Sequence, residues 1–140
     1  MFRLILITFI LLVSFNNINA SMTKENLVEF IEKPMRLGEK DKNLPVWEIL
    51  NKNKELHSYI FETFDLAPIA GFSGGKMNML VKIDLEGNFL DVVVLEQDEP
   101  VFVSGLGVVP FVEFLEQYKG KSLKDSIKVG SLKSSGGAVH

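Results

Sequence analysis

Residues 77–96, with the sequence MNMLVKIDLEGNFLDVVVLE, contain two apolar runs on either side of a short turn. The runs Met77–Asp84 and Phe89–Glu96 have the length and composition that are typical of strands. Between them lie residues 85–88, LEGN, with Gly87 where a positive φ is most easily taken. We therefore predict an antiparallel hairpin over residues 77–96 as the centre of the fold.

Elements predicted on both sides of this hairpin include two helices and a strand. Residues 24–33 carry apolar side chains at helical spacing after Thr23, a residue suited to cap a helix. From Ser58 the apolar period changes to two, which is typical of a strand. Residues 110–119 repeat apolar side chains at i, i+3, i+4 and i+7, and Gly120 suits the position just past a helix.

The order of these elements defines the predicted fold class. Residues 34–56 show only fragments of periodicity and are expected to be irregular or to form short strands, and Ile127–Val129 is a candidate for one more strand. Hairpins and helices in this order indicate an α+β domain built on an antiparallel sheet, with the two helices packed on the central hairpin. A chain of 140 residues has the length of one domain.

The first twenty residues have the features of an export signal. Arg3 is followed by an apolar run over residues 4–15, and then by asparagines and Ala20, a small residue suited to cleavage. A membrane span needs roughly 18 or more apolar residues, and this run ends at residue 15. Cleavage is therefore expected, and a short retained anchor is the alternative. We expect residues 1–20 to be a signal peptide or short anchor and residues 21–140 to form the domain.

Composition excludes several classes of function. The chain has 15 basic and 18 acidic residues, a net charge of −3 at pH 7, and removal of residues 1–20 would take away Arg3 alone. Because no basic stripe is present, we expect no nucleic-acid partner. The chain has no cysteine and only two histidines, His57 and His140, so thiolate chemistry, a histidine-based metal site and a catalytic triad are not expected.

Two glycine-rich segments and an acidic cluster are the remaining candidates for chemistry. Residues 71–76, GFSGGK, lack the spacing of a P-loop, and residues 104–107, SGLG, precede the second predicted helix, where free amides attract anions. Both segments also have the composition of ordinary connections. Glu96, Asp98 and Glu99 have neither calcium-loop spacing nor the separation of a hydrolase pair, so solvation of a strand end is their simplest interpretation.

Three segments together resemble a known family. They are residues 59–81, with the pattern D-x-x-P-I-x-x-[YF]-S-G over 65–74, residues 94–101, with L-E-x-x-E-P, and residues 114–120, with Q-Y-x-G. In this order and with these gaps, they resemble the FMN-binding domain that begins NosR/NirI-type proteins, over about residues 27–130. More distantly the chain is similar to the flavin subunits of Rnf and sodium-pumping quinone reductase complexes, whose E-T-P-G-L-G stretch is matched only by Glu99-Pro100 and Gly105-Leu106-Gly107.

The resemblance implies an extracytoplasmic FMN domain, attached in full-length members to a membrane span and a cytoplasmic ferredoxin-like part that support nitrous oxide or nitrite respiration. It implies electron transfer by the flavin, without catalytic side chains, and a membrane-bound or periplasmic redox partner. In the family, the FMN phosphate is joined to the last threonine of an S-G-A-T-x-T motif. The only threonines here are Thr8, Thr23 and Thr63. The expectation is a domain incomplete at its C-terminus, or a free-standing one that binds flavin weakly or not at all.

The resemblance also implies which residues border the flavin. An isoalloxazine ring needs an apolar wall, amide donors near its pyrimidine edge, and a positive or amide-lined phosphate site. The candidate cofactor-binding residues, all from adjacent loops, are Phe72, Ser73, Lys76, Glu99, Ser104 and Gly105. A cofactor-free interaction module of the same fold, docking at the periplasmic membrane face through a sheet edge, is the alternative. A hydrolase that uses Asp98 and Glu99 is a third hypothesis.

Overall fold

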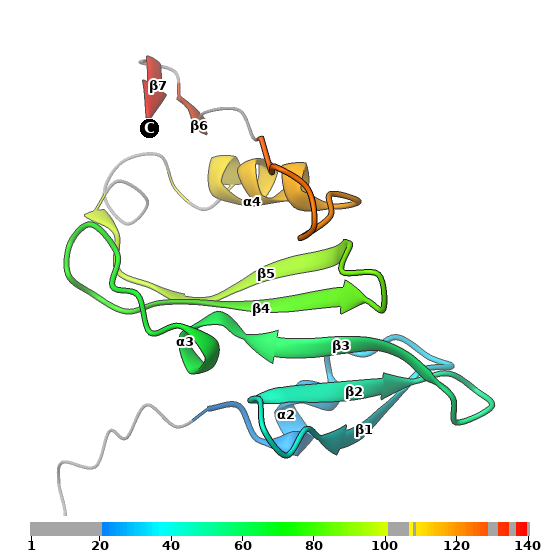
Figure 1. Cartoon of the computed structure of the whole chain (residues 1–140). Helices are drawn as coiled ribbons and strands as arrows, with labels where there is room; N and C mark the ends of the chain where they lie inside the picture. The colour runs from blue at the N-terminus through cyan, green and yellow to red at the C-terminus, as the bar shows by residue number, and fades with distance from the viewer. Residues whose placement is uncertain (1–20, 101–106, 108, 129–131, 135–136, 140) are drawn as a thin grey trace, which may run out of the picture.

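The computed structural model describes residues 21–100, 107, 109–128, 132–134 and 137–139. Most of this part of the chain belongs to a five-stranded antiparallel sheet with the order β1-β2-β3-β4-β5 (Figure 1). The strands are β1 (Arg36–Lys40), β2 (Val46–Leu50), β3 (Leu56–Glu62), β4 (Met77–Asp84) and β5 (Phe89–Gln97). Each strand pairs with the one that precedes it in the chain, so the predicted α+β class on an antiparallel sheet is confirmed.

Short helices accompany the sheet. They are α2 (Lys24–Val28), α3 (Thr63–Leu66), α4 (Val109–Leu115) and the 3₁₀ helix η2 (Glu116–Tyr118). In Figure 1, α2 lies by β1 and β2, whereas α4 lies beyond β5 and contacts that strand. A separate pair of strands, β6 (Leu132–Ser134) and β7 (Gly137–Val139), reaches α4 through β6. None of the helices in the described residues is long and apolar enough to cross a membrane.

The main core lies between the N-terminal segment and one face of the sheet. Its buried centre consists of Leu27 from α2, Ile49 from β2, Ile60 from β3 and Leu80 from β4. Partly buried apolar side chains surround this centre: Met22, Phe30, Ile31, Met35, Leu37, Trp47, Val93 and Leu95. Because alternate residues of a strand share a face, each strand contributes few side chains to this layer. The core therefore joins elements that are distant in sequence.

The predicted hairpin is confirmed, with β4 ending at Asp84 and β5 beginning at Phe89. Gly87 in the turn has a φ of 88°, the left-handed conformation that glycine adopts without steric cost. The carboxylate of Asp84 accepts hydrogen bonds from the backbone N of Asn88 (2.7 Å), its Nδ2 (2.7 Å) and the backbone N of Glu86 (3.0 Å). These bonds hold the pKa of Asp84 below its usual value, and the bond from the Asn88 side chain has the largest effect.

The helix predicted over residues 24–33 is shorter than its apolar pattern indicated. Thr23 caps it as expected, because its Oγ1 accepts from the backbone N of Asn26 at 3.4 Å. Beyond Val28 the amides of Phe30 and Ile31 donate to carbonyls three residues back, which is the bonding of a 3₁₀ turn. Both side chains still pack on the core. The pattern identified the buried side chains and was wrong about the length of the helix.

The helix predicted over residues 110–119 is present in two parts. It begins as α4 at Val109 and continues from Glu116 as η2. Phe111 and Leu115 are its buried side chains. Gly120 has a φ of 75° just past the end, as its position predicted.

Residues 34–56 contain two short strands, β1 and β2, which confirms the second of the two alternatives expected for this segment. Register shifts lie between Leu37 and Lys40 and again between Ile49 and Leu50, and each shift interrupts the alternation that identifies a strand. The strand predicted at Ile127–Val129 is not formed at residues 127 and 128, and residue 129 lies outside the described residues.

Replacing Leu80 by alanine tests the core. Leu80 is 2% exposed, so Leu80→Ala should lower the free energy of unfolding by about 2–5 kcal/mol, from lost apolar burial and the cavity left behind. Urea unfolding followed by the fluorescence of Trp47, the single tryptophan, measures this loss. Leu85→Ala is the matched control, because Leu85 is 51% exposed in the β4–β5 turn and should change the free energy by no more than about 0.5 kcal/mol. Equal losses would contradict the assigned core.

Replacing Asn88 by alanine tests the turn. Asn88→Ala removes the Nδ2 donor, so the pKa of Asp84 should rise towards the ordinary aspartate value of about 3.9. Because the folded pKa is depressed, ionised Asp84 stabilises the protein above the unfolded pKa, and this stabilisation is lost as pH falls through the folded pKa. Carboxyl titration by NMR measures the change. Asp41 is the internal control, since the backbone amides of Asn43 and Leu44 lower its pKa and the substitution leaves them intact.

Candidate functional site

The connection between β3 and β4 forms an apolar tip at one end of the sheet. We call residues 67–76 the β3–β4 loop. Residues 66–75 include no charged side chain, and Ile69 and Phe72 are 72% and 101% exposed. The loop is closed by backbone bonds from Gly71 N to Gly75 O (2.9 Å) and from Gly74 N to Gly71 O (3.0 Å). Phe72 therefore extends into solvent from a hydrogen-bonded frame.

Glu99, two residues after β5, is buried against this loop at 6% exposure. Its Oε1 accepts hydrogen bonds from the backbone N and the Oγ of Ser73, both at 3.2 Å. A Cβ placed on Gly71 would lie 1.9 Å from the same oxygen, so the carboxylate occupies the space that a larger residue would need. Glu99 thus ties the segment that follows β5 to the loop that precedes β4.

Lys76 lies at the base of the loop, where β4 begins. Its Nζ is 3.1 Å from Glu96 Oε2 and 4.9 Å from the centre of the Phe64 ring. The ammonium group thus has a carboxylate and an aromatic face as neighbours, and both interactions are attractive. Lys76 is the positive charge that immediately follows the uncharged residues 66–75.

The structure brings together four of the six predicted cofactor-binding residues: Phe72, Ser73 and Lys76 from the loop, and Glu99 from the segment after β5. Ser104 and Gly105 lie outside the described residues. Both donors of Ser73 are directed at Glu99. Asp98 is exposed whereas Glu99 is buried, so these two residues do not form an open carboxylate pair.

A second buried carboxylate, Glu62, was not expected from the sequence. Asn78 Nδ2 donates to Glu62 Oε2 at 2.6 Å, and the backbone N of Met22 donates to Oε1. Asn78 Oδ1 accepts in turn from the backbone N of Phe64 at 3.1 Å. This cluster fixes the start of α3 and the N-terminal segment to the sheet. The signal in the sequence was the position of Glu62 on the same face of β3 as Ile60, which points it inward.

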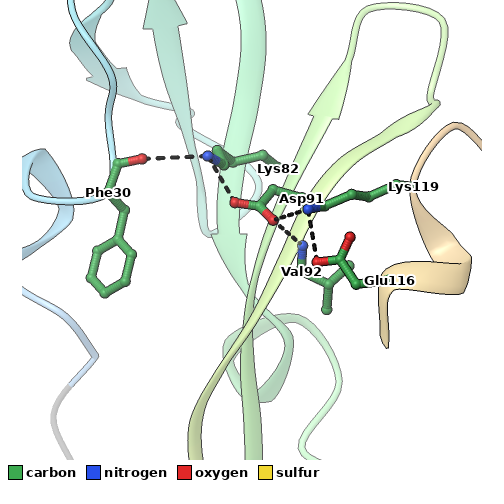
Figure 2. Close-up of polar contacts among 6 residues, drawn as sticks. All are labelled: Phe30, Lys82, Asp91, Val92, Glu116 and Lys119. Carbon is green, nitrogen blue, oxygen red and sulfur yellow. Dashed lines mark hydrogen bonds and ion pairs between the residues drawn. The ribbon is translucent and has the colours of Figure 1, made fainter. Parts of the chain in front are cut away.

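A cleft of about 280 Å³ opens between the chain after α2 and the start of β5. Figure 2 shows its polar network, in which Lys82 Nζ contacts the Phe30 carbonyl oxygen (3.5 Å) and Asp91 Oδ2 (3.0 Å). Lys119 Nζ contacts Asp91 Oδ1 (3.6 Å) and Glu116 Oε1 (2.8 Å). The hydrogen bond with Glu116, and then the charge of Asp91, raise the pKa of Lys119. Both lysines already have carboxylate partners, so the cleft shows no preference for a ligand of either charge.

Groups that could bind a metal are lacking in the part of the chain that the structure describes. No three or more His, Cys, Asp or Glu side chains come together there. The same residues contain no buried side-chain nitrogen or oxygen without a hydrogen-bond partner. The tip of the sheet is the candidate site because it presents the exposed aromatic ring of Phe72.

Comparison with known proteins relates the chain to one kind of regulator. Over 81 residues, 58% of this chain, it is 27% identical to the regulatory protein NosR of Stutzerimonas stutzeri. Over 81 residues it is 30% identical to the regulatory protein NosR of Pseudomonas aeruginosa. The match spans only 11% of the length of each relative. No family model and no solved structure matches significantly. The chain is thus similar to a small part of NosR proteins.

Replacing Asp91 by asparagine tests the network of Figure 2. The mostly buried Lys82 would lose its carboxylate, so Asp91→Asn should lower the free energy of unfolding by about 1–3 kcal/mol, the usual cost of a lost hydrogen bond to a charged group. Glu116→Gln is the control, because its pair with Lys119 is exposed and should change stability by no more than about 0.5 kcal/mol. Urea unfolding of both variants measures these changes. An Asp91→Asn protein with the wild-type free energy of unfolding would show that the network does not stabilise the fold.

Proposed function

We propose that this chain is an extracytoplasmic FMN-binding domain of an electron-transfer or regulatory protein of the nitrous oxide respiration type. The observation that carries the proposal is the identity of 27% and 30% to two NosR regulatory proteins over 81 residues. FMN is included in the proposal because the motifs of residues 65–74 and 95–100 resemble those of the FMN-binding domain in that family.

The geometry of the tip supports a flat aromatic ligand. Phe72 presents a fully exposed ring against which an isoalloxazine would stack. Lys76 supplies the nearest positive charge along the loop for a phosphate. The phosphate would take the place of Glu96 as the partner of this lysine. The donors of Ser73 are directed at Glu99 and would not serve the pyrimidine edge. When bound, FMN supplies the electron-transfer chemistry; the residues of the loop hold and orient it.

Binding to this chain would be non-covalent, because Thr8, Thr23 and Thr63 are its only threonines and none lies in an S-G-A-T-x-T motif. Export by residues 1–20 would place the domain on the periplasmic side, facing a membrane-bound or periplasmic redox partner. The acidic balance of the chain is consistent with a protein partner rather than with nucleic acid.

The second candidate function is a cofactor-free protein-interaction module at the periplasmic membrane face. The exposure of Ile69 and Phe72 on an uncharged loop favours it, since exposed apolar side chains that lie together mark surfaces for protein partners. The mutual satisfaction of Ser73 and Glu99 also favours it, because neither needs a ligand.

Titration of FMN fluorescence with the purified protein tests the first proposal. The wild-type chain should quench FMN, and Phe72→Ala should weaken binding about tenfold through loss of the stacking ring. Leu85→Ala removes an exposed apolar side chain at the opposite end of β4 and should leave the affinity unchanged. Absence of quenching by the wild-type protein would remove FMN binding and leave the interaction module.

A further inference from the structure

The β3–β4 loop combines a flexible sequence with a defined shape. Residues 71–75 include three glycines, and Gly74 has a φ of 81°. A glycine-rich segment loses much conformational entropy when it is fixed, so a contact from outside the segment adds to the two backbone bonds that close it between Gly71 and Gly75 and between Gly74 and Gly71. Glu99 makes such a contact, because its carboxylate receives both donors of Ser73.

We propose that Glu99 is the positioning residue of this loop: it holds residues 71–75 in the shape that presents Phe72 to a flat ring, and it does not itself touch the ligand. The choice of a flat ring as the ligand rests on the proposed function. The role of Glu99 in holding the loop is independent of that function. The burial of Glu99 beside a fully exposed Phe72 separates the two roles, since one side chain supports the loop from within and the other faces solvent.

Gly71 is the complementary half of the arrangement. The three atoms nearest to a Cβ at this position all belong to the Glu99 side chain: Oε1 at 1.9 Å, Cδ at 2.9 Å and Cγ at 3.6 Å. A methyl group at position 71 would therefore displace the carboxylate from Ser73 without meeting the backbone. Once Glu99 is shortened to alanine, those atoms are gone and the methyl group has room.

Holding the loop affects binding without adding a contact to the ligand. A loop already in its binding shape loses less entropy when a ligand settles on it, so its affinity is higher. Removal of the support should thus weaken the binding of a flat ring as much as a lost contact does. The effect should pass through Phe72, because Phe72 is the side chain that the loop presents.

Limited proteolysis with chymotrypsin, which cleaves after Phe72, tests the holding of the loop. Glu99→Ala and Gly71→Ala should each be cut there about tenfold faster than wild type, because a protease needs a locally opened chain. Glu99→Gln keeps an acceptor of the same shape and should be cut at nearly the wild-type rate. The double variant Gly71→Ala/Glu99→Ala should be cut no faster than Glu99→Ala alone. Wild-type rates in both single variants, or additive rates in the double variant, would overturn the proposal.

Cleavage is compared below the melting temperature of each variant. If Glu99→Ala does not fold, the comparison of Gly71→Ala with Glu99→Gln tests the proposal, since the first displaces the end of the Glu99 side chain and the second keeps an acceptor oxygen there. Faster exchange of the Ser73 amide hydrogen in Gly71→Ala alone would support the proposal. Equal protection in Gly71→Ala, Glu99→Gln and wild type would overturn it.

FMN titration of a second double variant tests the link to Phe72. Glu99→Ala should weaken FMN binding about tenfold, and in a Phe72→Ala background the same change should have no further effect. A purely structural loss would weaken binding equally in both backgrounds and would overturn the positioning role. If wild type does not bind FMN and the proteolysis pattern holds, the holding role of Glu99 stands and FMN is the wrong ligand.

Discussion

The described part of the chain depends on one buried cluster to which α2 and three strands each contribute a side chain. Leu27 belongs to one buried cluster with Ile49 of β2, Ile60 of β3 and Leu80 of β4, so a short helix helps to cover a face built from three strands. An antiparallel sheet needs one face shielded from water, and α2 has only five residues for this. The cover is completed by apolar residues that follow the helix: Phe30, Ile31 and Met35. The strands held in this way fix where the loops at the ends of the sheet emerge.

Buried carboxylates organise the loop end of the sheet. Glu62 receives Asn78 and the N-terminal backbone, and Glu99 receives Ser73. A buried carboxylate is costly unless its oxygens are hydrogen-bonded, so each arrangement is stable only while its donors stay in place. These contacts join residues 16 to 40 positions apart. The shape of the β3–β4 loop is therefore set by a tertiary contact to Glu99 together with the backbone bonds between its own residues.

Sequence alone predicted what depends on near neighbours. The hairpin over residues 77–96 and its Gly87 turn were correct because period, length and turn residue lie within one short segment. The helix over residues 24–33 was too long because apolar spacing of three and four residues suits an α-helix and a 3₁₀ turn alike. The inward position of Glu99 was not foreseen, since an acidic residue at a strand end usually faces water and its donor lies 26 residues earlier.

The two segments that carry most of the family resemblance, residues 65–74 and 95–100, meet in space through Glu99 and Ser73. The carboxylate acts from beneath the loop and leaves its outer surface uncharged, so one interaction both orders the tip and keeps it apolar. In the cleft of Figure 2, by contrast, an incoming anion would have to displace Asp91 or Glu116 from a lysine. A flat ring that stacks on Phe72 displaces no existing pair, although a phosphate attached to that ring would compete with Glu96 for Lys76. The fully exposed phenyl ring, for which the cleft offers no counterpart among its described residues, favours the tip as the place where a flat ligand binds.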